Sequence, residues 1–198
     1  MVKWLHENRT ERYSADNIMD EIALAGHVEI LEWFEQNTSE RCSNTVLERV
    51  DNLQVIKYLH ERNEGETNRF GFSTDTMDNT CSLDAIKWLH ENRTEGCTEK
   101  AFFNAIKNNN SRVLQWLLDN RTEYTKQSME NDIDKLLVQA FVAESNCTLK
   151  WMLYNLTIPI GTLLKYKEKY SHAIEPYIVL VEYLSKLEKN NFNSNNSL

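Results

Sequence analysis

The sequence of 198 residues contains only five Gly and two Pro. Chains built from many tight β-turns need both residues, because Gly supplies positive backbone angles and Pro supplies a fixed one. Their scarcity argues against an all-β chain rich in hairpins and favours helices.

Basic residues are also in short supply, since 22 Lys and Arg stand against 30 Asp and Glu, for a net charge of -8. Nucleic-acid binding needs a basic face that replaces counterions, so a nucleic-acid partner is not expected. Residues 1–64 hold seven basic and thirteen acidic residues, which places -6 of the charge there. This concentration indicates either an ordinary solvated surface or a face for a basic protein partner.

Long apolar runs are missing as well. The longest near the end of the chain, Tyr177–Val181, is far shorter than the roughly 20 residues that span a bilayer. Lys3, His6 and Glu7 interrupt the start, so no signal peptide is recognisable. We therefore expect a soluble monomer in the cytoplasm, with the nucleus as the alternative compartment, and no membrane partner.

Motifs for chemistry are absent from the sequence. The four cysteines show no C-x₂-C spacing, so neither a zinc site nor structural disulfides are expected. The His-Glu pair at His90 has no second His four residues later, unlike a metalloprotease motif. With no Gly-rich phosphate loop and no nucleophile motif, we expect no enzyme activity, no cofactor and no catalytic or metal-binding residues.

What the sequence does contain is a repeat. The stretch "WLHENRT" occurs at Trp4–Thr10 and again at Trp88–Thr94, and four further stretches resemble it. The six anchoring aromatic residues are Trp4, Trp33, Tyr58, Trp88, Trp116 and Trp151, with spacings of 29, 25, 30, 28 and 35 residues. A recurrence of this size is typical of a solenoid of helical pairs.

Each anchor lies near the end of a helix with a wide apolar face. In the third copy, one stripe runs through Leu53, Ile56 and Leu59 and a second through Val55 and Tyr58. A helix that touches neighbours on both sides needs such a face, so we expect the anchors to be buried between hairpins. The anchors predicted to be buried are Trp33, Trp88 and Trp116. A shorter first helix should precede each anchor helix, opened by a capping hydroxyl at Ser14, Ser43, Ser73 or Thr98.

Asn follows the anchor by four residues in five of the six copies: Asn8, Asn37, Asn92, Asn120 and Asn155. Asn tolerates the left-handed conformation that ends helices, so we predict this conformation at Asn92. The resulting Asn-x-Ser/Thr pattern then reflects helix termination and turn chemistry rather than glycosylation.

One position before the first helices alternates between aromatic residues and Cys, which indicates a core position: Tyr13, Cys42, Phe72, Cys97 and Tyr124.

The segment Asn17–Phe34, "NIMDEIALAGHVEILEWF", resembles the ankyrin repeat. Met19-Asp20 fall on the Leu-His of its Thr-Pro-Leu-His motif, and Gly26-His27 fall on its Gly-His. The phrase around Trp88 is similar to divergent ankyrin arrays of some protists and giant viruses. The resemblance implies an all-α solenoid of stacked antiparallel helical hairpins. Most spacings are shorter than the family's unit of about 33 residues, so we expect shortened or missing β-hairpin fingers.

The chain divides into three expected regions. Residues 1–157 form the ankyrin-like array, whose first repeat is incomplete because the chain begins inside a second helix. Residues 158–190 predict two helices, with Pro176 in the first turn of the second, that form a C-terminal helical cap. Residues 191–198 are rich in Asn and Ser and predict a disordered tail.

The resemblance implies a protein-interaction module or scaffold. A substrate adaptor of a ubiquitin ligase, acting through residues 158–190, is the alternative. Carboxylates on the early first helices are candidate contacts for a basic partner: Asp16, Asp20, Glu21, Glu48 and Asp51. In the longer connection Arg62–Thr74, Phe70 is either an exposed contact or a side chain packed under the loop.

Overall fold

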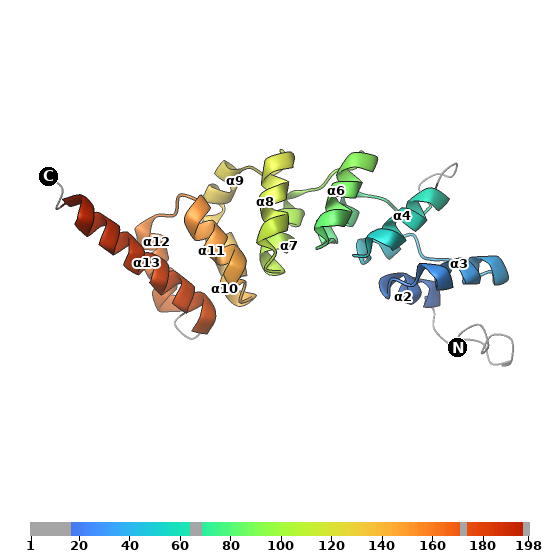
Figure 1. Cartoon of the computed structure of the whole chain (residues 1–198), viewed down its shortest axis with the longest axis horizontal. Coiled ribbons are helices and arrows are strands. Elements are labelled where there is room, and N and C mark those ends of the chain that lie inside the picture. Colours follow the sequence, from blue (N-terminus) through green and yellow to red (C-terminus); the bar gives the residue numbers. More distant parts are fainter. Residues whose placement is uncertain (1–16, 64–68, 171–173, 196–198) are drawn as a thin grey trace. The chain divides into compact units, whose positions relative to one another are not determined.

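The structure, a computed structural model, describes residues 17–63, 69–170 and 174–195 (Figure 1). Every regular element in these ranges is a helix, and none is a strand, which confirms the all-α repeat fold. The helices are α2 (Ile18–Leu24), α3 (Val28–Asn37), η1 (Val46–Glu48), α4 (Leu53–Arg62), α5 (Thr74–Asn79), α6 (Leu83–Asn92), α7 (Glu99–Lys107), α8 (Ser111–Asn120), α9 (Lys126–Asn131), α10 (Ile133–Val142), α11 (Asn146–Asn155), α12 (Ile160–Lys169) and α13 (Ile174–Asn195).

The anchor residues sit in helices of identical length. The second helices α3, α4, α6, α8 and α11 each contain 10 residues, and the anchor is the sixth residue of each. The spacing pattern therefore predicted both the helices and their register.

The anchors are less buried than predicted. The fully buried positions are the fourth and seventh of each second helix, such as Ile86 and Leu89 in α6. Trp33, Trp88 and Trp116 are only half-buried. The sixth position lies beside this core stripe, where an indole ring reaches toward the adjoining hairpin and keeps one edge in water. The contact of His90 with Trp116, whose ring centroids are 5.3 Å apart, is one such approach.

The first helices vary in length with the space available. Between the anchors of α3 and α4, which are 25 residues apart, only the three-residue 3₁₀ helix η1 forms. The helix predicted to open at Ser43 is therefore wrong, because the segment is too short for two helical turns. Between α8 and α11 the spacing is 35 residues, and the extra length forms α9 before α10.

Left-handed residues occur inside the hairpins, between the first and second helices. Gly26, Asn109 and Glu144 have φ angles of 79°, 54° and 51°. The residue after each donates its N–H to a carbonyl five residues back, as in His27 to Ile22 at 3.1 Å. This pattern ends the first helix and turns the chain sharply into the second.

The second helices end differently from the prediction. Asn92 is the last residue of α6, and the following Arg93 is extended, so the left-handed conformation predicted for Asn92 is wrong. The side-chain Nδ2 of Asn92 instead donates to the carbonyl oxygen of Trp88 at 2.8 Å. The same 2.8 Å bond joins Asn37 to Trp33, Asn120 to Trp116 and Asn155 to Trp151. The recurrent Asn thus adds a side-chain hydrogen bond within the last turn of its own helix.

A carboxylate on three of the short helices binds the start of the next repeat. Asp20 accepts hydrogen bonds from the N–H and the hydroxyl of Ser43, at 2.7 and 2.5 Å. Asp78 accepts the same pair of bonds from Thr98, at 2.7 and 2.6 Å. Glu130 accepts from the N–H of Thr157 at 2.7 Å. Each of these three acids directly follows a buried Met, and we call these contacts carboxylate clamps.

The alternating aromatic and Cys position belongs to the core, as predicted. Cys42, Phe72, Cys97 and Tyr124 are all buried. Burial, together with nearby carboxylates, raises the pKa of the thiol to about 12 for Cys42 and to about 11 for Cys97. Both thiols therefore stay protonated at neutral pH and behave as apolar side chains.

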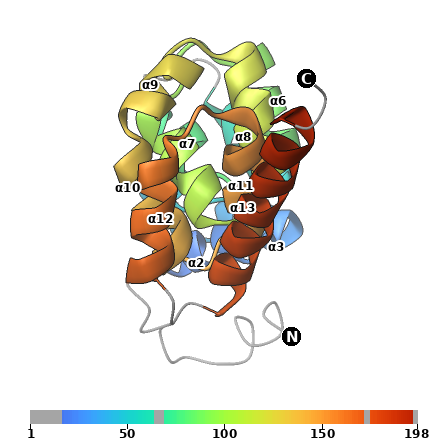
Figure 2. The same ribbon diagram turned by 90° about the vertical axis from the view of Figure 1, so that its left-hand side faces the viewer.

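The described residues group into two compact units, one ending at Phe72 and one beginning at Ser73. In the first, α2 packs against α3 and η1, and α3 packs against α4. In the second, Figure 2 shows α7, α10 and α12 along one side and α8, α11 and α13 along the other. Tyr166 of α12 and Tyr170, the residue directly after α12, stack on Phe141 of α10, with ring centroids 5.9 and 4.8 Å away.

The C-terminal end differs from the prediction in one respect. Two helices follow residue 158, and Pro176 lies in the first turn of α13. However, α13 continues to Asn195, so the tail predicted as disordered from residue 191 starts too early. Asn and Ser are only moderate helix formers, but extending an existing helix adds one hydrogen bond per residue without a new nucleus.

The Asp78 clamp should matter more than its surface neighbours. Replacing Asp78 with Ala removes two charge-assisted hydrogen bonds and should cost about 2–4 kcal/mol, measured by urea unfolding. Asp75 on the same helix pairs with Lys100 at 3.2 Å on the surface and is the control. Asp75→Ala should cost less than about 1 kcal/mol. Equal losses in the two variants would contradict the clamp.

The role of Asn92 can be tested by comparing two substitutions. Because Asn92 is helical, Asn92→Gly should be less stable than Asn92→Ala by about 0.5 kcal/mol in urea unfolding. A left-handed residue would give the opposite order, since Gly adopts that conformation without steric cost.

Candidate interaction surfaces

The first-helix side of the first unit exposes carboxylates, as predicted. Glu21, Glu48 and Asp51 are exposed, and α2 packs directly against η1. Arg49 lies among them and approaches Glu21 at 3.5 Å, which offsets part of the negative charge. We call Glu21, Glu48 and Asp51 the acidic rim. Asp16, another candidate from the sequence, lies outside the described residues.

Asp20 does not belong to this rim. Its side chain is 6% exposed, and both carboxylate oxygens accept hydrogen bonds from Ser43. The interpretation of Asp20 as a partner contact is therefore wrong. A carboxylate that stabilises the next repeat is already satisfied inside the protein.

Phe70 is likewise not an exposed contact, because its ring is fully buried. The alternative, packing beneath the loop, is correct. The N–H of Arg69 donates to Asn63 Oδ1 at 2.8 Å, and the Arg69 guanidinium lies 5.2 Å from the Phe70 ring centroid. Gly71 has a φ of 69° and runs so close to the carbonyl of Asn44 that a Cβ would overlap it. These contacts hold the ring inward.

The acidity of the first unit extends beyond the predicted side. Glu29 and Glu32 of α3 and Glu61 of α4 are also exposed. The sequence pattern located the excess charge but not its distribution over both helical layers, because the register of each acid on its helix decides its direction.

Glu35 and its neighbours form a closed cluster. The hydroxyl of Tyr58 donates to Glu35 Oε2 at 2.8 Å, and Arg62 Nε donates to the same oxygen at 2.5 Å. The guanidinium carbon of Arg62 lies 4.2 Å from the Tyr58 ring centroid. Burial and the bond to Glu35 hold the pKa of Tyr58 well above its usual value. The cluster joins α3 to α4, and its groups are already paired with each other.

The two "RTE" triplets at residues 93–95 and 121–123 are ion-paired turns. Arg93 binds Glu95, and Arg121 binds Glu123. Arg121 Nη1 also lies 3.0 Å from Nδ1 of His90. Burial alone would raise the pKa of Glu123, but hydrogen bonds from Arg121 and from backbone N–H groups lower it below 4.5. Arg121 therefore connects the end of α8 to the turn that follows it, through Glu123, and to α6, through His90.

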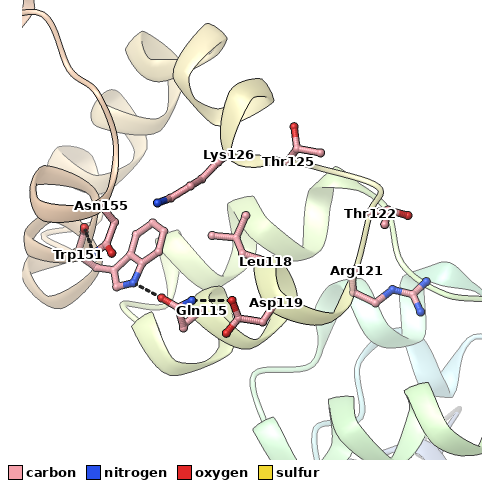
Figure 3. A pocket seen from close by; sticks show the side chains of 9 residues that line it. All are labelled: Gln115, Leu118, Asp119, Arg121, Thr122, Thr125, Lys126, Trp151 and Asn155. Carbon is pink, nitrogen blue, oxygen red and sulfur yellow. Dashed lines mark hydrogen bonds between the residues drawn. The ribbon is translucent and has the colours of Figure 1, made fainter.

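A cavity of about 400 Å³ opens beside this turn (Figure 3). It lies between α8, the start of α9 and α11. Its lining residues are Gln115, Leu118, Asp119, Arg121, Thr122, Thr125, Lys126, Trp151 and Asn155. We call it the Trp151 pocket. Its volume falls within the range of small ligand sites.

One wall of the Trp151 pocket is a chain of hydrogen bonds. The indole Nε1–H of Trp151 donates to Gln115 Oε1 at 2.8 Å, and Gln115 Nε2 donates to Asp119 at 2.9 Å (Figure 3). Because each amide atom of Gln115 has one role in this chain, the orientations of the indole ring and the carboxylate are fixed together. No sequence pattern indicates this group, since Trp151 and Gln115 are 36 residues apart.

The described residues offer little support for other kinds of site. No group of three or more His, Cys, Asp or Glu side chains within them is arranged to hold a metal ion. None of the described helices is long and apolar enough to cross a membrane.

Comparison with known proteins gives one family match. A family model described as "Ankyrin repeats (many copies)" matches residues 79–118, which run from the end of α5 to α8. No curated protein and no solved structure matches the chain. The matched segment contains two anchors and supports the ankyrin-like interpretation of the repeat.

The Arg121–Glu123 pair should make stability depend on pH. Because the pKa of Glu123 is lower in the folded protein, its contribution is present above pH 4.5 and is lost as the pH falls through the folded-state pKa. The variant Glu123→Gln should melt below the parent at pH 7, and the difference should narrow near about pH 3. A difference in melting temperature that stays constant over this range would contradict the assignment.

Proposed function

We propose that this protein is a non-enzymatic protein–protein interaction module that acts as a scaffold. The observation that carries the proposal is the stack of anchor hairpins together with its match to ankyrin repeats over residues 79–118. Ankyrin repeats are generally protein-interaction modules. Because neighbouring hairpins are joined by internal contacts, the outer side chains are left for a partner.

The acidic rim is the proposed contact for a basic partner. Glu21 of α2 and Glu48 of η1 lie on elements that pack together, and Asp51 follows in the connection from η1 to α4. All three are exposed. Residues 1–64 carry -6 of the chain's net charge of -8, which adds a long-range attraction. Exposed charges of this kind raise the encounter rate more than the final affinity, and salt weakens their effect.

The test is charge reversal with a matched control. A partner is first captured by cross-linking to the full chain, and its association rate is then measured at low and high salt. Glu21→Lys, Glu48→Lys and Asp51→Lys together should lower the low-salt rate by about tenfold. Circular dichroism first confirms that each variant is folded.

The control reverses Glu29, Glu32 and Glu61 to Lys, which changes the net charge equally on α3 and α4. This control should lower the association rate at low salt less than reversal of the acidic rim does. Equal decreases in both variants would show that only net charge matters, and an unchanged rate would remove the acidic rim as a contact.

A further inference from the structure

We propose that the Trp151 pocket binds a short peptide segment of a protein partner in which an apolar side chain adjoins an acidic residue. The proposal rests on the proposed function as an interaction module. It concerns a surface in the second unit that no family match or sequence motif assigns.

The apolar part of the pocket is an aromatic wall and an aliphatic side chain. Trp151 and Leu118 are both half-buried, so each presents part of its apolar surface to the cavity. An indole ring held by its Nε1–H bond to Gln115 cannot easily turn away from the cavity. A Leu or aromatic side chain of a partner would cover these two surfaces and remove them from water.

The positive part is the ammonium group of Lys126. In the part of the chain that the structure describes, this group makes no hydrogen bond or ion pair. Its positive charge attracts the Glu130 carboxylate electrostatically without a direct contact. The other cation of the pocket, Arg121, is already bound to Glu123. Figure 3 shows the Lys126 side chain directed toward the ring of Trp151. Lys126 is therefore placed to pair with a carboxylate beside the apolar side chain.

The negative part lies across the pocket. Figure 3 shows Asp119 on the opposite side of Leu118 from Lys126. Asp119 accepts one hydrogen bond, from Gln115, and a carboxylate can accept several. Its remaining capacity suits a backbone N–H of an extended chain. A peptide supplies all three groups at once: an N–H donor, an apolar side chain and a neighbouring carboxylate.

The charge arrangement decides between possible occupants. A small inorganic anion would use Lys126 alone and leave the aromatic wall in water. A basic peptide would use Asp119, which already accepts a hydrogen bond from Gln115, and would face Lys126 with a like charge. An acidic peptide faces a like charge at Asp119 but pairs with Lys126, which makes no ion pair among the described residues. An acidic and apolar peptide uses every part of the pocket, which is why we commit to this occupant.

The experiment follows the indole N–H signals of the ¹⁵N-labelled full chain by NMR. The chain has five Trp residues, and the Trp151 signal is identified by its loss in Trp151→Phe. The probe is the peptide acetyl-Gly-Leu-Glu-Gly-amide, compared with the same peptide carrying Lys in place of Glu. The Trp151 signal should shift saturably, with about fivefold tighter binding of the acidic peptide at low salt and a smaller difference at high salt.

The variant Lys126→Gln should remove this preference, whereas Lys107→Gln should keep it. Both lysines are exposed, so neither change threatens folding, and Lys107 at the end of α7 does not line the pocket. A shift in other indole signals but not in that of Trp151 would overturn the proposal. Binding of acetate or phosphate as tight as that of the peptide would also overturn it.

The outcome is separable from that of the proposed function. If the peptide leaves Trp151 unchanged while reversal of the acidic rim still slows the captured partner, the pocket proposal fails and the interaction module stands. If reversal of the acidic rim leaves the association rate of the captured partner unchanged but the peptide binds as described, the pocket proposal stands and the acidic rim fails.

Discussion

The carboxylate clamp is the contact on which the register of neighbouring hairpins depends. An acid on a short helix accepts a backbone N–H from the start of the next repeat, and in two cases also a hydroxyl. Apolar packing holds helices together but tolerates sliding, because dispersion and burial are not directional. A hydrogen bond to a buried carboxylate does not tolerate sliding, because a displaced partner leaves a charge unpaired. The clamp therefore gives the stacked hairpins one defined register.

The same logic explains why the side chains near the anchors are so similar from copy to copy. The Asn four residues after Trp33, Trp88, Trp116 and Trp151 bonds the anchor's carbonyl. The Arg and Glu of two turns bind each other. These contacts hold the last helical turn and the turn after it with local partners. The outer surfaces are then free to differ, and they do: the first unit presents carboxylates, and the second presents an aromatic pocket with one free ammonium group.

Much of the fold could be predicted from the sequence, because it depends on periodicity. The anchor spacing predicted the second helices, and the alternation of Cys and aromatic residues predicted a core position. The prediction for Asn92 failed because its side chain bonds a carbonyl four residues earlier while its backbone stays helical. The prediction for Asp20 failed, and the two alternatives for Phe70 stayed open, because the direction of a side chain depends on neighbours that are distant in sequence, such as Ser43 for Asp20. The Trp151 pocket was missed for the same reason, since its walls come from separate hairpins.

The constant element in this chain is the ten-residue second helix, whereas the segment between successive anchors varies from 25 to 35 residues. The shortest segment forms a single 3₁₀ turn, and the longest forms two helices. Differences in length thus occur in the layer of first helices, whereas the second helices keep the same length and the same anchor position. Insertions and deletions in the first-helix segments can therefore change one surface of such a protein without changing how its second helices pack.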